Sequence, residues 1–126
     1  MILLDTSSLI DPPATWPGGV LGSSTLCLAE LEFGLAAARS ASEHATRTRN
    51  LAVYRATLEW IPFEASDAAS FGVLAAKVAS RRPSHARSTD IKIAAQAYTL
   101  GAALLTRNVR DFDLVSDLVE ILDGNA

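Results

Sequence analysis

The sequence has 126 residues, a length typical of one domain, and 49% of them are apolar, so we expect a globular fold with one core. The net charge of −3 argues against a surface that is basic all over, although it allows a local basic patch. No apolar stretch approaches the roughly 20 residues of a membrane span, and Cys27 is the only cysteine, which excludes an internal disulfide. We therefore expect one domain over residues 1–126 in the reducing cytoplasm, away from membranes.

The first half of the chain predicts one strand followed by two helices. An aliphatic run over Met1–Leu4 is typical of a buried strand, and it ends at once on Asp5. The segment "DPPATWPGG" is rich in Pro and Gly and predicts a loop. Hydroxyl side chains at Ser23–Thr25 offer N-caps for a helix through "LCLAELEFGLAAA". A second helix is expected over about His44–Glu59.

The second half predicts alternating strands and helices. "WIPF", bounded by Pro62, suits an edge strand, and Ser66 is the expected N-cap of the next helix. The basic loop "RRPSHARST" precedes a helix with apolar residues at helical spacing, which ends near Gly101. "AALLT" predicts a buried strand, "RNVRDFD" a turn and "LVEIL" a last strand. This alternation predicts a parallel sheet with helices on its faces.

Four acidic residues stand where strand or helix ends would bring them to one crevice. Asp5 follows the first strand directly, and Glu30 lies in the second turn of the helix that begins near Ser24. Asp90 falls in the first turn of a later helix, and Asp111 follows "AALLT" by a few residues. In open parallel sheets the functional crevice lies outside the carboxyl ends of the strands, so we expect these carboxylates to face one another.

Each acid alone also has a structural interpretation. Asp90 would complement a helix dipole, Asn108 and Asp111 have the spacing of a capping box, and Glu30 would be an ordinary solvated helix residue. Asp5 is harder to explain this way. A carboxylate at the end of a hydrophobic strand is costly unless a positive or hydrogen-bonding group meets it.

A divalent cation would explain all four acids together. Converging carboxylates raise one another's pKa, and a cation removes that penalty. Hard oxygen ligands suit Mg²⁺, with Mn²⁺ as a possible substitute. Zinc is not indicated, because Cys27 is alone and His44 and His85 lie far apart in the sequence. Carboxylate-bound metal beside a basic loop is typical of phosphodiester-cleaving sites, so we expect a metal ion to be the partner of Asp5.

Four segments, "LLDTSSLID", "SSTLCLAELEFG", "STDIKIAAQA" and "LLTRNVRDFD", resemble in order and spacing the motifs of PIN-domain ribonucleases, most of all the VapC toxins of bacterial toxin–antitoxin pairs. The resemblance covers essentially the whole chain. It implies a three-layer α/β/α sandwich around a mainly parallel sheet, and a Mg²⁺-dependent endoribonuclease whose substrate is RNA. It also implies a homodimer and a small antitoxin protein as partner.

Carried over motif by motif, the resemblance implies a set of metal-binding and catalytic acids. Asp5 and Asp90 would be the principal metal ligands. Glu30 would complete the cluster, and Asp111 would be the fourth acid, with Asp113 as the alternative to it. Thr6 would orient the Asp5 carboxylate or the attacking water, and the site would be supported by two more residues, Thr106 and Asn108.

Basic residues near these motifs are candidate RNA contacts, because arginine grips phosphate with two parallel hydrogen bonds. The alternative is that they are ordinary solvated charges. The residues that border the predicted crevice are Arg81, Arg82, Arg87, Arg107 and Arg110.

Other functions leave different traces in a sequence. A phosphotransferase of the haloacid dehalogenase kind needs a second Asp where Ser7 stands, and a phospho-accepting receiver domain needs a Lys where Arg107 stands. Two alternatives stay open: a PIN-like module that binds RNA or protein without cutting it, and a metal-independent ribonuclease that uses His44 and His85.

The helix expected over about His44–Glu59 carries an apolar stripe of Leu51, Tyr54 and Leu58. Such a stripe exceeds what one small core covers, which indicates surface for a partner or a second copy.

Overall fold

The computed structural model describes all 126 residues and is built on a five-stranded parallel sheet. The strands follow the order β3-β2-β1-β4-β5, with β1 in the centre. Their bounds are β1 Ile2–Leu4, β2 Leu21–Ser24, β3 Glu59–Ile61, β4 Ala103–Thr106 and β5 Ile121–Asp123. Every neighbouring pair is parallel, so all carboxyl ends lie at one edge. The predicted parallel sheet is therefore confirmed.

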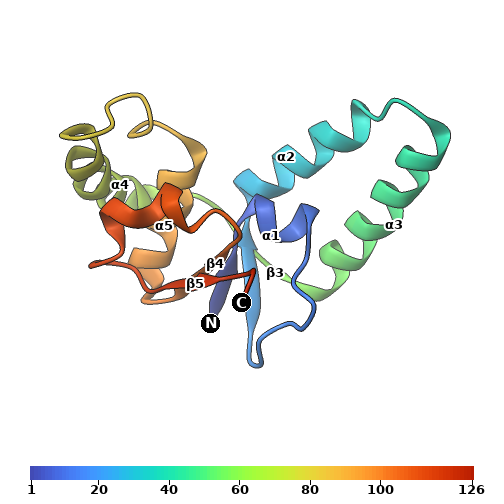
Figure 1. The fold of residues 1–126 in the computed structure, drawn as a ribbon, viewed down its shortest axis with the longest axis horizontal. Coiled ribbons are helices and arrows are strands. Elements are labelled where there is room, and N and C mark those ends of the chain that lie inside the picture. Colours follow the sequence, from blue (N-terminus) through green and yellow to red (C-terminus); the bar gives the residue numbers. More distant parts are fainter.

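Helices flank the sheet on two sides (Figure 1). One side carries α1, α2 and α3, and the last two of these project from the sheet as a helical hairpin. The other side carries α4 and α5, and a 3₁₀ helix, η1, lies between β4 and β5 in the chain. The bounds are α1 Thr6–Ile10, α2 Thr25–Ala36, α3 Ala41–Thr57, α4 Ala65–Ala79, α5 Thr89–Leu100 and η1 Val109–Val115. The expected PIN-like α/β/α sandwich is confirmed.

The core lies mainly between the sheet and α5. Leu3, Leu4 and Leu104 of the central strands are fully buried, and so is Ile91 of α5. Most of the other buried residues of α5 are alanines, whose small side chains let the helix pack close to the sheet. The helix ends as predicted at Gly101, whose φ of 64° is a left-handed conformation that glycine adopts without strain.

Two short elements were missed by the sequence analysis. The segment Thr6–Ile10 forms α1 rather than continuing into a loop, and Leu21–Ser24 forms β2 before the predicted helix begins. Both segments are too short and too polar to show a helical or strand-like repeat of apolar residues. Their structure is therefore determined by contacts with residues distant in the sequence. β2, for example, is defined by its ladder with β1, in which Leu3 pairs with Gly22.

Some predicted boundaries were wrong. The N-cap of α4 is Glu64, which forms a capping box with Asp67, and not Ser66. The helix expected from about His44 begins at Ala41, because Ser40 accepts a hydrogen bond from the amide of Glu43. The predicted turn "RNVRDFD" lies largely within η1, and only the end of "LVEIL" belongs to β5. None of the helices combines the length and apolarity that a membrane crossing requires.

Candidate metal centre

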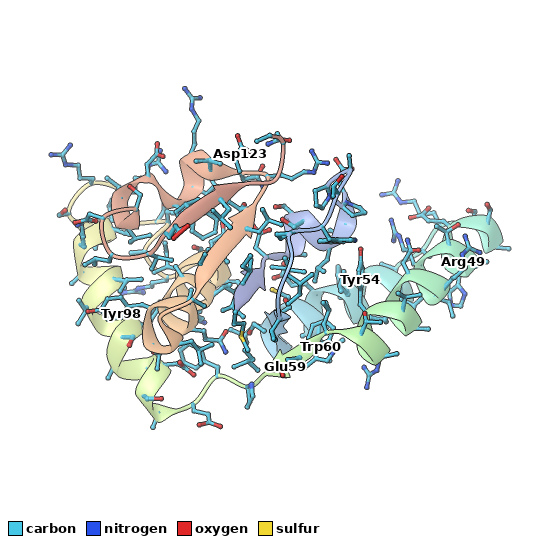
Figure 2. All side chains as sticks on the ribbon, turned by 90° about the horizontal axis from the view of Figure 1, so that it is seen from below. Arg49, Tyr54, Glu59, Trp60, Tyr98 and Asp123 are labelled. Carbon is cyan, nitrogen blue, oxygen red and sulfur yellow. The ribbon has the colours of Figure 1, made fainter.

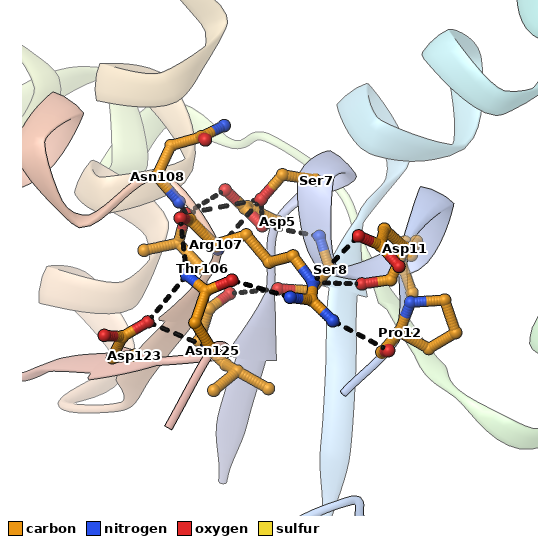
Figure 3. Close-up of polar contacts among 12 residues, drawn as sticks. Asp5, Ser7, Ser8, Asp11, Pro12, Thr106, Arg107, Asn108, Asp123 and Asn125 are labelled. Carbon is orange, nitrogen blue, oxygen red and sulfur yellow. Dashed lines mark hydrogen bonds and ion pairs between the residues drawn. The ribbon is translucent and has the colours of Figure 1, made fainter. Parts of the chain in front are cut away.

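Asp5 lies at the carboxyl end of β1 and is buried, with 3% of its surface exposed. Its carboxylate is the N-cap of α1: Oδ1 accepts the amide of Ser8 at 3.0 Å and the hydroxyl of Ser7 at 2.7 Å. Oδ2 accepts the hydroxyl of Thr106 at 2.6 Å (Figure 3). These hydrogen bonds already stabilise the buried charge, and the metal ion expected as a partner of Asp5 stays a prediction.

Thr106 joins the two central strands at this edge. The residue is fully buried at the end of β4, and its hydroxyl donates to Asp5 while accepting the amide of Asn108 at 2.9 Å. Asn108 supports the turn through this main-chain bond, whereas its side chain makes no capping bond to η1. The capping-box interpretation of Asn108 and Asp111 is thus wrong, and the Asp111 carboxylate is not used as a cap.

Glu30 reaches the same edge from α2. Its side chain is exposed, and its Oε1 accepts the hydroxyl of Thr6 at 3.0 Å. Thr6 was predicted to orient Asp5 or an attacking water. In the structure it orients Glu30 instead, and Ser7 takes the place beside Asp5.

Asp90 and Asp111 complete the acidic edge from α5 and η1. Burial raises the pKa of the half-buried Asp90, and the negative charges of Asp111, Asp5 and Glu30 raise this pKa further. The charges of the other three predicted acids therefore all act on Asp90. Asp113 is exposed and is not among the charges that raise the pKa of Asp90, whereas Asp111 is, which favours Asp111 over Asp113 as the fourth acid.

The donor set suits a hard cation, although no three acidic, histidine or cysteine side chains lie close enough together here to hold one ion. Oδ1 of Asp5 uses both lone pairs, whereas Oδ2 uses only one and keeps one for a cation. No side chain donates a hydrogen bond to the carboxylate of Asp90 or Asp111. Ser88, the N-cap of α5, has a buried hydroxyl without any partner, which a water in the crevice would satisfy.

Three solved structures show the same fold across the length of the chain. VapBC-5 of Mycobacterium tuberculosis, a member of the VapBC family of toxin–antitoxin systems, has a chain that matches with a TM-score of 0.80 at 24% identity, over 98% of this chain and 97% of that one. A chain of VapBC2 from Rickettsia felis, solved bound to promoter DNA, matches with a TM-score of 0.78 at 21% identity, over 98% of both chains. A chain of VapBC-1 from nontypeable Haemophilus influenzae matches with a TM-score of 0.72 at 22% identity, over 98% of both chains.

The chain has the PIN-like fold found in VapBC toxin–antitoxin complexes. No protein-family model matches the sequence, and no curated protein matches it either. The agreement with VapBC chains is thus one of fold.

One arginine of this VapBC-like fold does not face the crevice as predicted. Arg107 donates to the carbonyls of Asp11 and Pro12 and to the side chain of Asn125, and it forms an ion pair with Asp11 at 3.4 Å (Figure 3). With its donors used this way, Arg107 ties the loop after α1 to the C-terminal residues. It is a structural residue rather than a free phosphate contact, because each bond fixes the guanidinium inside the protein.

Three contacts at the acidic edge were not predicted. Ser7 and Ser8 hold Asp5, and the imidazole Nε2 of His85 lies 2.8 Å from the carbonyl oxygen of Asp111. The first two follow from the N-cap spacing of "DTSS", which the sequence does contain. Nothing in the sequence shows the contact of His85, because 26 residues separate the two partners.

Proposed function

We propose that the protein is a Mg²⁺-dependent endoribonuclease that acts as the toxin of a toxin–antitoxin pair. One observation carries the proposal: Asp90 is half-buried, and three carboxylates from different elements, Asp111, Asp5 and Glu30, raise its pKa further. Such repulsion destabilises the metal-free protein, and a divalent cation turns it into attraction. The VapBC-like fold supports the choice of toxin among the possible nucleases.

Asp5, Glu30, Asp90 and Asp111 would hold the ion. Asp5 is already fixed by three hydrogen bonds. When bound, Mg²⁺ (or Mn²⁺) would supply the Lewis acidity that makes water a nucleophile at neutral pH. The protein's own part is to orient the acids: Ser7, Ser8 and Thr106 hold Asp5, and Thr6 holds Glu30.

The basic residues of the α4–α5 loop and η1 support a nucleic acid as substrate. Arg81, Arg87 and Arg110 are exposed and form no ion pair with the protein, so their charges are free to neutralise phosphates. They stand on segments adjoining Asp90 and Asp111. We propose RNA as the polymer, in keeping with the resemblance of the four sequence motifs.

A small antitoxin and a second copy of the chain are the proposed partners. The structural neighbours are chains of toxin–antitoxin complexes. In addition, the α2–α3 hairpin exposes apolar side chains: Phe33 is 75% exposed and Val53 is 54% exposed. The predicted stripe is not this exposed surface. Leu51 is buried, and Tyr54, which lies nearer the sheet than Arg49 in Figure 2, is half-buried and packs against the core, as does Leu58 at the C-cap of α3.

The alternative nuclease that uses two histidines has little support. His44 is exposed on α3, on the side of the projecting hairpin, whereas His85 lies in the loop between α4 and α5 on the other side of the sheet (Figure 1). A base and an acid must both reach the reacting atoms, and these two residues do not share a site.

The decisive experiment is incubation with total RNA in Mg²⁺ or in chelator, followed by mapping of the product ends. The proposal expects cleavage that stops with chelator and leaves 5′-phosphates. Cleavage that ignores the chelator and leaves cyclic phosphates would favour the histidine mechanism. Binding without cleavage, in a protein shown to bind Mg²⁺, would favour the alternative of a catalytically silent PIN-like binding module.

We expect RNA affinity to depend less on salt when Arg81 and Arg87 are both replaced by Ala. Each lost contact with single-stranded RNA removes roughly 0.7 from the slope of log K against log salt, so the double variant should lose about 1.4. The control is Arg107→Ala, which should lower stability but leave the slope unchanged, since its guanidinium is bound within the protein. Fluorescence anisotropy at several salt concentrations with chelator present measures both. An unchanged slope in the double variant would mean that these charges are only solvated.

A further inference from the structure

The loop between α4 and α5 contacts the first turn of η1 at two successive carbonyl groups. Nη1 of Arg82 donates to the carbonyl oxygen of Arg110 at 3.2 Å, and Nε2 of His85 lies 2.8 Å from that of Asp111. Two bonds to neighbouring peptide groups fix the orientation of that turn, and the Asp111 side chain leaves the main chain between them.

The chemistry of the His85 contact is unambiguous. A carbonyl oxygen only accepts hydrogen bonds, so Nε2 must carry the hydrogen. The contact is therefore a hydrogen bond donated by His85, and it braces this turn of η1.

The same loop leads directly to Asp90. The amide of Ser88 donates to the carbonyl of His85 at 3.0 Å, and Ser88 is the N-cap of α5, whose first turn carries Asp90. Ala86, next to His85, is buried, which anchors the loop to the core. One main-chain hydrogen bond and the imidazole contact of His85 thus connect the element that bears Asp90 to the peptide that bears Asp111.

We propose that His85, assisted by Arg82, is a positioning residue that sets the separation of the Asp90 and Asp111 carboxylates. The inference deepens the proposed Mg²⁺ site and rests on it. It also divides the basic loop into two kinds of residue: Arg82 and His85 bind the protein, whereas Arg81 and Arg87 are free for RNA. Metal ligands need such outer partners, because affinity depends on how well the ligands are oriented before the ion binds.

His85→Phe and His85→Gln test the proposal. Phe keeps a ring but cannot donate, whereas the amide of Gln reaches a position close to that of Nε2. Replacing an outer partner of a metal ligand costs about 10–100-fold in affinity, and we expect about tenfold weaker Mg²⁺ binding in His85→Phe by calorimetry. His85→Gln should bind within a few-fold of wild type. His44→Phe, on the far side of the molecule, is the matched control.

A second measurement does not depend on the metal. In the metal-free protein, amide hydrogen exchange at Asp111 and Phe112 should be faster in His85→Phe than in wild type and should recover in His85→Gln. Arg82→Ala should raise exchange in the same turn, with its exposed neighbour Arg81→Ala as control. Because Arg82 is exposed, Arg82→Ala should not disturb folding, so it tests the brace even if the ring substitution at His85 does.

The outcomes separate the two proposals. Exchange and Mg²⁺ affinity that are unchanged in His85→Phe would overturn the positioning role, and so would equal losses in the Phe and Gln variants. A wild-type protein that binds no Mg²⁺ would overturn the proposed function instead. In that case the exchange of Asp111 and Phe112 would still decide whether His85 braces η1.

Discussion

Replacing Asp90 by Asn should make the metal-free protein at least as stable as wild type and should abolish most RNA cleavage. Burial and the charges of Asp111, Asp5 and Glu30 all raise the pKa of Asp90, so its ionised form is disfavoured in the folded state. Asn removes the charge at almost constant shape. If Asp90 only complemented the dipole of α5, the same change would cost about 0.3–1 kcal/mol. The two explanations thus predict changes of opposite sign in the free energy of unfolding of the metal-free protein.

The dependence on pH follows from the direction of the shift. A folded-state pKa above the unfolded value means that the folded protein binds the proton more tightly. The metal-free wild type should therefore lose the penalty from ionised Asp90 as pH falls through the folded pKa toward the unfolded one. The stability advantage of Asp90→Asn should be largest at neutral pH and should shrink on acidification. Urea unfolding in chelator at several pH values measures it.

Addition of Mg²⁺ should reverse the order of the two proteins. At a Mg²⁺ concentration 100 times the wild-type Kd, binding adds about 2.7 kcal/mol to the stability of the folded state. The variant should gain far less and should cut RNA more slowly by orders of magnitude. Lys92→Gln, two residues further along α5, is a control for a general effect of changing charge on this helix. An Asp90→Asn protein that unfolds more easily without metal yet cuts RNA normally would remove Asp90 from the site.

The sequence was most informative where a helix has a long apolar face. The helix from Ser88 to Gly101 could be predicted because its apolar residues repeat at helical spacing and a glycine follows it; in the structure it supplies much of the core. The strand "AALLT" was equally clear. In such segments, the local sequence pattern and burial in the core favour the same structure. For this reason the sequence also predicted correctly that Asp90 lies at the start of a helix and that Asp111 follows a strand.

Short elements and charged contacts could not be predicted in this way. β2 contains Gly22, where an added Cβ would lie 3.0 Å from the carbonyl oxygen of Glu59, so its small size serves a strand-to-strand approach that sequence does not display. Arg107 was predicted to contact RNA because of its charge, but in the structure it binds other residues of the protein. Charge alone does not distinguish these roles, because the partners, Asp11 and Asn125, are distant in the sequence and close only in the fold.

Asp5→Ala should act on stability in the opposite direction to Asp90→Asn. Asp5 accepts three hydrogen bonds, from Ser7, Ser8 and Thr106, and it is the N-cap of α1. Alanine removes the cap, at a cost of about 0.5–2 kcal/mol. It also leaves buried donors without acceptors, at about 1–3 kcal/mol for such a group. We expect a total loss of about 2–5 kcal/mol in the metal-free protein, measured by urea unfolding in chelator.

Asp5→Asn is the variant that separates this structural role from the role of the charge. The amide oxygen of Asn can still accept the amide of Ser8, so α1 keeps its cap, and most of the stability should remain. The negative charge is lost in both variants, so Mg²⁺ binding and cleavage should fall in both. Stability would then follow the hydrogen bonds, while metal affinity would follow the charge. If Asp5→Ala in chelator were as stable as the wild type, the three hydrogen bonds would contribute little to stability. If Asp5→Asn bound Mg²⁺ with normal affinity, Asp5 would serve the fold alone.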